Sequence, residues 1–319
     1  MSERFLVTGA YGCIGAWTVA QLVREGVEVV GVDAGDDDRR LRDLLSEEEL
    51  ARAAFMRADI SDPAQVALCF TRKPTHVIHL AALQVPDCRK NPVLGAAVNV
   101  VGTVALFAAA AAAELDTPVV FASSVAAFAA VDGGGRAAVD PSGPPDTHYG
   151  VFKVANEGTA RVFAMESGLN SIGLRPHVVY GAGRDRGLTA APTFAMEAAA
   201  QGLEYTIAYS GRCEMQYAPD VAAAFIAAAR ASFTGATVVN VPGTSVLIDE
   251  VVTEIERVIP EVAGRIEVSG PALPFPDELD SGTFADIVGS VPLTPLSEGV
   301  AATIAHFRRS SGGANPAGR

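Results

Sequence analysis

Tyr149 and Lys153 lie four residues apart, a spacing that places two side chains on one face of a helix. A tyrosine hydroxyl has an ordinary pKa of about 10, and using it as a base near neutral pH requires roughly 4 kcal/mol of stabilisation of its anion. A neighbouring ammonium is one source of that stabilisation. The chain contains only three lysines, so a functional Tyr-Lys pair is favoured over a chance pair of surface side chains. Such a pair can transfer a proton to a carbonyl or from an alcohol.

Ser124 follows a short apolar segment, 118–122, which has the pattern of a buried strand. Open α/β sheets bind their ligands beyond the carboxyl ends of the strands. A hydroxyl at that position can hydrogen-bond a substrate oxygen and hold it against Tyr149. Serines at strand ends are common, so Ser124 is a candidate only in combination with Tyr149 and Lys153.

Gly9, Gly12 and Gly15 form a GxxGxxG turn between an expected strand, 4–8, and an expected helix, 13–25. Glycines at these places permit a tight turn and a close approach of the backbone to a pyrophosphate. The free N–H groups and the dipole of the helix N-terminus favour such an anion. The turn therefore predicts dinucleotide binding, and an ordinary glycine-rich turn is the alternative.

Asp33 ends the next expected strand, 27–33, and lies 18 residues after Gly15. A carboxylate at this place accepts hydrogen bonds from the adenine ribose and repels a 2′-phosphate. The residue therefore favours NAD over NADP, although Arg39 and Arg40 follow closely.

Strands and helices alternate along the first 180 residues, which predicts a Rossmann-type doubly wound parallel sheet of the α/β class. Strands are expected at 4–8, 27–33, 54–59, 76–80, 118–122 and 170–175, and helices at 13–25, from Asp62, at 92–115 and at 149–167. Residues 1–180 are predicted to form an NAD-binding domain to which later segments return. A smaller, interleaved substrate-binding region is predicted over 181–319, with isolated strands at 204–207, 237–241 and 265–268.

The overall charge excludes some classes of protein. The chain has 319 residues, 37 acidic against 24 basic, and a net charge of −13, which disfavours nucleic-acid binding. Four cysteines and five histidines are scattered without the spacing of metal ligands, which predicts a cytoplasmic protein with reduced cysteines and no metal site. The uncharged segment 91–113 is long enough for a membrane span, but Pro92, Gly95 and Asn99 interrupt it and favour a buried helix.

Taken together, these motifs resemble an extended short-chain dehydrogenase/reductase of the NAD-dependent epimerase/dehydratase type, over nearly the whole chain. The resemblance includes the segments Asp59-Ile60, His79-Leu80-Ala81-Ala82, Val98-Asn99-Val100 and Leu174-Arg175-Pro176, and Tyr180-Gly181. It implies that Ser124, Tyr149 and Lys153 are catalytic, and that Lys153 also contacts the nicotinamide ribose.

The resemblance also implies the ligand contacts. Cofactor contacts are expected along the glycine turn and at the strand ends, from Gly9, Tyr11, Gly12, Cys13, Ile14, Gly15, Asp33, Asp59, Ile60, Leu80, Ala81, Ala82, Asn99, Tyr149, Lys153 and His177. Substrate contacts are expected from Leu83, Ser124, His177 and Arg184. A purely structural role for His177 is an equally open interpretation.

The departures from the family pattern concern the substrate. Members that act on nucleotide sugars usually carry Asn where this chain has Val178, and an Arg-Asp pair where it has Cys213 and Glu214. A diphosphate needs cationic donors, so these residues argue against a nucleotide sugar. Arg184, Arg186 and Arg212 remain candidate anion contacts. Dehydratases usually add an acidic pair where Val125-Ala126 follow Ser124.

The favoured hypothesis is an NAD-dependent oxidoreductase that transfers a hydride between NAD and a small hydroxyl or carbonyl compound, such as a sugar, polyol or hydroxy acid. The alternatives are a nucleotide-sugar epimerase that retains its NAD, and a non-catalytic NAD-sensing regulator. The substrate itself stays open, because its pocket would come from the loops near 83–90, 131–147 and 181–216. A homodimer that pairs the helices 92–115 and 149–167 is expected, with no nucleic-acid or membrane partner.

Overall fold

The computed structural model describes residues 2–129, 136–137 and 143–312, so most of the predicted loop 131–147 lies outside the described residues. Within these ranges, seven strands form a parallel sheet of order β11-β7-β5-β4-β1-β2-β3. The strands are β1 (Arg4–Thr8), β2 (Glu28–Asp33), β3 (Ala54–Arg57), β4 (His76–His79), β5 (Val119–Ala122), β7 (Ser171–Arg175) and β11 (Ala236–Asn240). The order confirms the Rossmann-type sheet. From β1 the sheet grows in one direction through β2 to β3, and in the other direction through β4, β5 and β7 to β11. Such sheets bind their ligands where this order of strands reverses, which is between β1 and β4.

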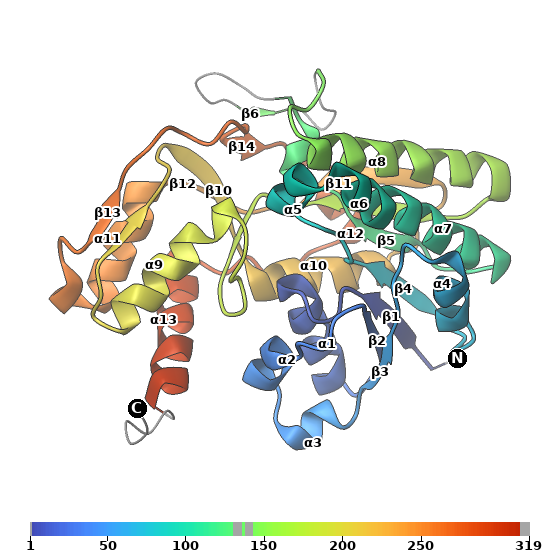
Figure 1. Ribbon diagram of the computed structural model, residues 1–319, viewed down its shortest axis with the longest axis horizontal. Helices are drawn as coiled ribbons and strands as arrows, with labels where there is room; N and C mark the ends of the chain where they lie inside the picture. Colours follow the sequence, from blue (N-terminus) through green and yellow to red (C-terminus); the bar gives the residue numbers. More distant parts are fainter. Residues whose placement is uncertain (1, 130–135, 138–142, 313–319) are drawn as a thin grey trace.

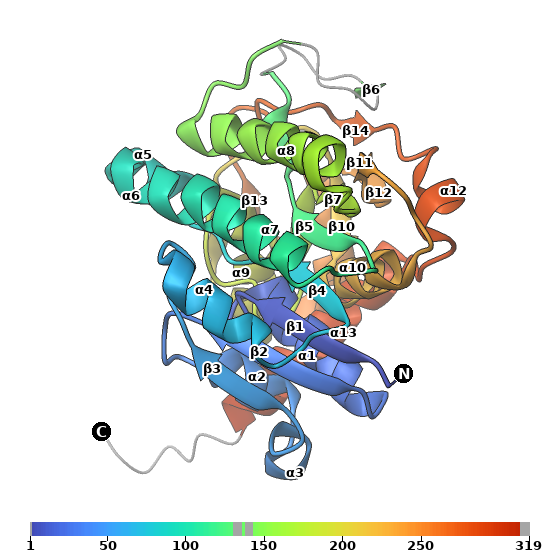
Figure 2. The same cartoon turned by 90° about the vertical axis from the view of Figure 1, so that its right-hand side faces the viewer.

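Helices cover both faces of the sheet because its strands are apolar on both sides (Figure 2). Phe5 and Val7 of β1 pack in the core that includes residues of α1 (Cys13–Arg24) and α10 (Ala218–Arg230), whereas Leu6 packs on the opposite face. The helices of that second face are α4 (Pro63–Phe70), α7 (Gly102–Ala112) and α8 (His148–Ser167). The shorter helices are α2 (Arg39–Leu44), α3 (Glu47–Leu50), α5 (Val85–Lys90) and α12 (Phe284–Val288), and 3₁₀ turns are η2 (Val125–Ala127), η3 (Leu188–Ala190) and η4 (Pro260–Val262).

A second lobe lies to one side of the sheet and has its own apolar core (Figure 1). It contains β8 (Val178–Tyr180), α9 (Ala191–Ala200), β9 (Tyr205–Ile207), β10 (Arg212–Tyr217), β12 (Thr244–Leu247), α11 (Ile248–Val258), β13 (Ile266–Val268) and α13 (Leu296–Gly312). The strands β8, β10 and β12 form one sheet, β9 pairs with β13, and β14 (Glu278–Leu279) pairs with β6 (Arg136–Ala137).

The strands predicted at 204–207, 237–241 and 265–268 are confirmed as β9, β11 and β13, but they are not isolated from other strands. The segment at 237–241 is β11, which pairs with β7 at the edge of the main sheet, and the other two segments pair with each other. The local sequence pattern does not indicate which strand each of these pairs with, because the path of the chain between the strands decides the pairing. The division at residue 180 remains an interpretation, since β8 before it pairs with β10 after it.

The predicted helix 92–115 is continuous from α6 (Pro92–Ala96) through a π turn, η1 (Ala97–Val101), into α7. It ends at Ala112, two residues before Glu114, whose φ of 50° is left-handed. By length and composition alone this helix could cross a membrane, with a mean hydropathy of 2.1 over its most apolar window. Its polar Asn99 and Thr103 are buried against the rest of the protein.

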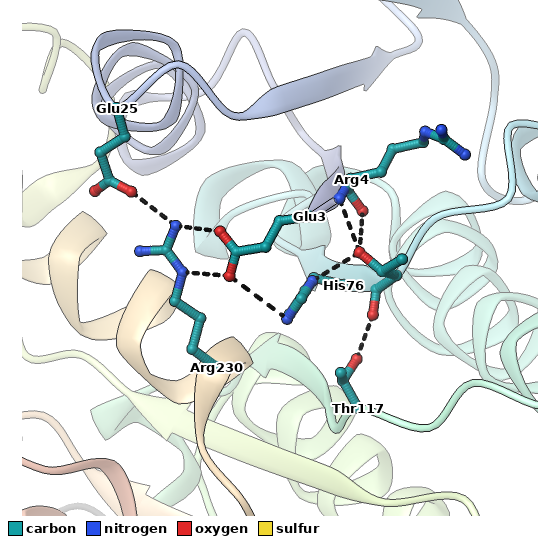
Figure 3. Close-up of polar contacts among 7 residues, drawn as sticks. Glu3, Arg4, Glu25, His76, Thr117 and Arg230 are labelled. Carbon is teal, nitrogen blue, oxygen red and sulfur yellow. Dashed lines mark hydrogen bonds and ion pairs between the residues drawn. The ribbon is translucent and has the colours of Figure 1, made fainter. Parts of the chain in front are cut away.

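A polar network lies at the amino ends of β1 and β4 (Figure 3). Arg230, at the end of α10, donates to both carboxylate oxygens of Glu3 at 2.9 and 2.7 Å and to Glu25 at 2.7 Å. The His76 ring stacks on Phe5 with centroids 4.5 Å apart and lies 4.0 Å from Glu3. The network fastens the chain start to α1 and α10, at the end of the sheet opposite the carboxyl ends of the strands.

His79 joins three elements inside the main core. Its Nδ1 lies 2.7 Å from the Thr8 hydroxyl of β1, and its Nε2 lies 3.0 Å from the Thr103 hydroxyl of α7. Burial, and to a smaller extent the charge of Lys153, lowers the pKa of His79 to about 3. The imidazole is therefore neutral in the folded protein over the pH range considered below, from about pH 7 to about pH 5.

Acidification should weaken the fold through His79. Between about pH 7 and about pH 5 the unfolded chain protonates this ring, whose ordinary pKa is about 6.5, while the folded chain does not. The free energy of unfolding should therefore fall by about 2 kcal/mol from this group as the pH drops. Urea denaturation at the two pH values measures the change. The His79→Asn variant should be less stable near neutral pH but show a smaller loss on acidification, and an equal loss would contradict the assignment.

Candidate active site

The glycine turn between β1 and α1 leaves no room for a Cβ at Gly9 or Gly15. Gly9 has a φ of 70°, and a Cβ at Gly15 would lie 2.0 Å from the Gly9 carbonyl oxygen. A Cβ at Gly9 would lie 2.7 Å from the amide nitrogen of Ala81, at the end of β4. Gly12 is the N-cap of α1 and supplies no capping side chain, so Cys13 and Ile14 begin the helix with N–H groups directed at the turn. The arrangement fits a pyrophosphate.

Asp33 lies at the carboxyl end of β2, next to this turn. Its two carboxylate oxygens accept from the amides of Tyr11 and Gly35, each at 3.0 Å. A carboxylate oxygen has two lone pairs, so both can also accept from ribose hydroxyls. The site therefore fits the adenosine half of NAD.

Arg39 and Arg40 are both engaged elsewhere. Buried Arg40 donates to the Tyr11 carbonyl at 2.6 Å, to the Gly183 carbonyl at 3.0 Å, and to Asp185. Arg39 pairs with Asp185 at 3.2 Å. Both guanidinium groups thus bind protein groups, and neither is held in place for the 2′-phosphate of NADP. They also fasten the loop after β8 to the glycine turn, a role that sequence reasoning missed because the two segments are far apart along the chain.

The other expected cofactor residues gather at the carboxyl ends of β3 and β4. Asp59 is exposed and accepts from the amide and hydroxyl of Ser61 at 2.9 and 2.7 Å. Ile60 lies under Gly102, and Leu80, Ala81 and Ala82 follow β4. Asn99 is committed to the backbone of Leu83, accepting from its amide at 2.7 Å and donating to its carbonyl at 2.9 Å. Asn99 therefore holds the loop that carries Leu83.

Lys153 and Tyr149 of α8 lie at the carboxyl end of β5, and Ser124 follows that strand by two residues. Lys153 is 3% exposed, and its ammonium donates to the Ala122 carbonyl at 2.6 Å and lies 5.2 Å from the centre of the Tyr149 ring. Ser124 caps the 3₁₀ turn η2 by accepting from the Ala126 amide at 3.1 Å. Thr147 caps α8 in the same way, accepting from Gly150 at 3.0 Å. The structure thus places Tyr149 beside Lys153, and the first turn of α8 against η2, the turn that Ser124 caps.

A buried network one turn beyond Lys153 fixes α8 against the sheet. Glu157 accepts from Nε and a terminal nitrogen of Arg175, each at 2.7 Å, and from the Ser123 hydroxyl at 2.5 Å. Ser123 precedes Ser124, and Arg175 ends β7. Sequence reasoning missed this role of Glu157, although its position four residues after Lys153 placed it on the same helix face.

The expected anion contacts do not converge. Arg184 donates to the Thr189 hydroxyl at 2.9 Å, and its buried Nε has no hydrogen-bond partner among the described residues. Arg186 and Arg212 are exposed, and Arg212 donates to the Ser245 carbonyl at 3.1 Å. Val178 and Cys213 lie in the apolar core of the second lobe. Burial raises the pKa of the Cys213 thiol to about 12.

The sheet order and the glycine turn together define a Rossmann-type dinucleotide-binding protein, with Tyr149 beside Lys153 at the carboxyl end of its sheet. The model of the NAD dependent epimerase/dehydratase family matches residues 5–241, and the chain belongs to this family. It is accordingly an enzyme, with NAD as its cofactor; the glycine turn and Asp33 fit that group.

Individual relatives agree with this assignment. The chain is 31% identical to a UDP-glucose 4-epimerase of Mycolicibacterium smegmatis, over 97% of this chain and 99% of the relative. A UDP-glucose 4-epimerase from Thermus thermophilus, solved in complex with NAD, is 28% identical with a TM-score of 0.80, and covers 98% of this chain and 100% of its own. An L-threonine dehydrogenase from Clostridium difficile has a TM-score of 0.83 at 20% identity, covering 97% and 98%, and shows the fold alone.

Gly150 should be required for the alignment of Tyr149 with Ser124. A Cβ at Gly150 would lie 2.1 Å from the Ala126 carbonyl oxygen, so Gly150→Ala should push the first turn of α8 away from η2. We expect a loss of about 2 kcal/mol in the free energy of unfolding and a fall of about tenfold or more in kcat. Denaturation and steady-state kinetics measure both effects.

Gly158, two turns further along α8, is the matched control. A Cβ there meets no atom within 4 Å among the described residues of the same chain. Gly158→Ala should therefore raise stability by up to about 1 kcal/mol through helix propensity and leave kcat unchanged. Wild-type stability and kcat in Gly150→Ala would show that the close approach does not position Tyr149.

Proposed function

We propose that the protein is an NAD-dependent dehydrogenase or reductase of a small hydroxyl or carbonyl compound, such as a sugar, polyol or hydroxy acid. In oxidation, Ser124 holds the substrate oxygen, and the Tyr149 phenolate removes the hydroxyl proton. The carbinol carbon gives up its hydride at the same time, so that a C=O bond forms. NAD supplies the hydride acceptor. In reduction, the Tyr149 phenol returns the proton to the carbonyl oxygen.

Lys153 supports both directions of this chemistry electrostatically. Its ammonium lies close to the Tyr149 ring and is fixed by the Ala122 carbonyl, so its charge cannot turn away towards solvent. In a buried site such a charge stabilises the phenolate more strongly than it would in water. Lys153 also has two further N–H donors, which suit a contact with the nicotinamide ribose.

The burial of Val178 and Cys213 is the observation that carries the choice of substrate. Both side chains lie in the apolar core of the second lobe, so neither position offers a donor to a diphosphate. Glu214 is buried as well and accepts from the Leu279 amide at 2.9 Å. A small substrate of low charge fits these surroundings better than a nucleotide sugar.

A nucleotide-sugar 4-epimerase is the second candidate. It is favoured by the 31% identity to the M. smegmatis UDP-glucose 4-epimerase along nearly all of both chains. An epimerase oxidises and re-reduces one substrate, so it keeps its NAD, whereas a dehydrogenase exchanges it.

Tyr149→Phe separates catalysis from cofactor binding. The variant keeps the ring beside Lys153 and loses the hydroxyl, so turnover should fall by about 10³-fold or more while NAD affinity stays within about twofold. NADH formation is followed by absorbance with a panel of sugars, polyols and hydroxy acids, each with NAD and NADP. Retained turnover in the variant would overturn the role of Tyr149. No NADH formation by the wild type would overturn the dehydrogenase proposal and favour the epimerase or an NAD-sensing regulator.

The state of the purified protein distinguishes dehydrogenase from epimerase. We expect NAD to be lost on dialysis and UDP-glucose not to bind. Mass spectrometry that finds one retained NAD per chain, together with calorimetric binding of UDP-glucose, would favour the epimerase.

We further propose that the protein is a soluble, cytoplasmic homodimer with no nucleic-acid or membrane partner. Large apolar side chains are exposed along α6, η1, α7 and α8: Val93, Leu94, Val101, Val104, Val151, Val154, Val162 and Met165. The opposite side of the continuous helix formed by α6, η1 and α7 packs against the rest of the protein through Asn99 and Gly102. A second copy of the chain would cover the exposed side from both helices, as a two-fold interface requires.

A charge in this face should separate the copies. We expect Val104→Glu and Met165→Glu to convert a dimer into a monomer, measured by light scattering during gel filtration. Leu203→Glu is the control, because Leu203 is similarly exposed but lies beyond α9 in the second lobe. A wild-type monomer, or dissociation by the control alone, would contradict the proposed interface.

A further inference from the structure

The Arg40 side chain joins three segments that are far apart in the sequence. Its guanidinium donates through Nε to the Gly183 carbonyl at 3.0 Å, through one terminal nitrogen to the Tyr11 carbonyl at 2.6 Å, and through the other to the Asp185 carboxylate. Only 8% of Arg40 is exposed. A lysine has a single nitrogen and cannot hold three acceptors in this fork, so the position uses the geometry of a guanidinium as well as its charge.

The Tyr11 carbonyl belongs to the peptide group that closes the glycine turn. In the same planar group, the Gly12 amide donates to the Gly9 carbonyl at 2.9 Å. Arg40 therefore holds one edge of this plane, and Gly9 holds the other. Gly12 is also the N-cap of α1, so the plane sets the direction in which the first free amides of the helix leave the turn.

The preceding peptide group reaches the carboxylate that fits the adenine ribose. The Tyr11 amide donates to Asp33 at 3.0 Å, so Tyr11 connects Arg40 on one side with Asp33 on the other. A rotation of the peptide between Tyr11 and Gly12 would carry the Tyr11 amide away from Asp33. Arg40 thus constrains both parts of the site that fit the adenosine diphosphate part of NAD.

Fastening the two lobes does not by itself account for the bond from Arg40 to Tyr11. The loop after β8 is also tied to α1 by the Trp17 indole, which donates to the Ala182 carbonyl at 2.9 Å. Arg39 adds a second tie by pairing with Asp185 at 3.2 Å. A nearly buried guanidinium that donates to a carbonyl of the glycine turn is more than such a tie requires.

We propose that Arg40 is a positioning residue of the cofactor site, which fixes the Tyr11 peptide so that Asp33 and the glycine turn can receive the adenosine diphosphate part of NAD. Asp185 holds the guanidinium in place. The loop after β8, which leads into the second lobe, therefore contributes to cofactor affinity through Arg40. The inference concerns the cofactor alone and is independent of the substrate and of the reaction proposed above.

Arg40→Met tests the positioning role, since it removes the guanidinium and keeps a side chain of similar reach. Its affinity for ADP should fall by about 10-fold or more, because the bond from a charged donor to Tyr11 is lost. The affinity for NAD should fall by the same factor, because the two ligands share the part of the site that changes. Isothermal titration calorimetry measures both affinities, and urea denaturation midpoints establish that the variant is folded.

Arg42→Met is the matched control. It removes the same charge from α2, but Arg42 is exposed and pairs with Asp38 at 2.9 Å and with Glu47 at 3.0 Å. Exposed ion pairs contribute little, so this variant should bind ADP and NAD within about twofold of the wild type. An equal loss in both variants would mean that positive charge attracts the phosphates from a distance, and would overturn the positioning role.

The ligand 2′-deoxy-ADP supplies a readout that a loss of stability does not change. The wild type should bind ADP more tightly than 2′-deoxy-ADP by about fivefold or more, because the missing hydroxyl leaves Asp33 without a donor. Arg40→Met should lose most of this preference, since Asp33 is no longer aligned by the Tyr11 amide. A less stable but otherwise unchanged site would bind both ligands more weakly and keep the preference, which would overturn the proposal.

Asp185→Asn tests the contribution of the loop after β8, and it is mild enough to test the proposal even if Arg40→Met does not fold. The asparagine oxygen can still accept from Arg40 but carries no charge, so NAD affinity and the preference for ADP over 2′-deoxy-ADP should each fall by about two- to fivefold. In the Arg40→Met background the same substitution should have no further effect. An unchanged affinity in Asp185→Asn, or a loss that persists without Arg40, would overturn the action of Asp185 through Arg40.

Discussion

The buried ammonium of Lys153 is the group on which the arrangement of the active site depends. An ammonium removed from water is costly unless a polar partner replaces the lost hydration, and the Ala122 carbonyl is that partner. This hydrogen bond requires α8 to approach the carboxyl end of β5 at a fixed distance. Tyr149, one turn earlier on α8, and Ser124, two residues beyond Ala122, are brought together by the same contact.

The approach of α8 is held from two further directions. Gly150 lets the first turn of the helix touch η2, and Glu157 ties its middle to Arg175 and Ser123. A buried ion pair adds little stability over apolar packing, but removal of either partner leaves an unpaired charge that costs about 3–5 kcal/mol. The pair therefore permits few alternative positions of α8, which is the property that a catalytic Tyr-Lys pair needs.

Local patterns predicted the parts of the structure that depend on near neighbours. The glycine turn, the helix start at Asp62 and the Tyr149–Lys153 pair each follow from a few consecutive residues. The pairing of β11 with β7 and the contacts of Arg40 with the loop after β8 join segments that are far apart in sequence, so no local pattern contained them. The π turn at Ala97–Val101 was missed because its residues have the same apolar pattern as an α-helix.

The net charge of −13 bears on how the two ligands are held. A pyrophosphate at the glycine turn can be met by backbone amides and the dipole of α1, so the cofactor needs no cluster of lysines. A second diphosphate, on the substrate, would need comparable donors in the second lobe. There the pairing of β8 with β10 puts Val178 opposite Met215, in apolar surroundings, and Arg212 is turned to solvent. Likeness to the epimerases extends over nearly the whole chain, and the apolar surroundings of Val178 and Cys213 are the part of the second lobe on which the proposal of a small hydroxyl or carbonyl substrate rests.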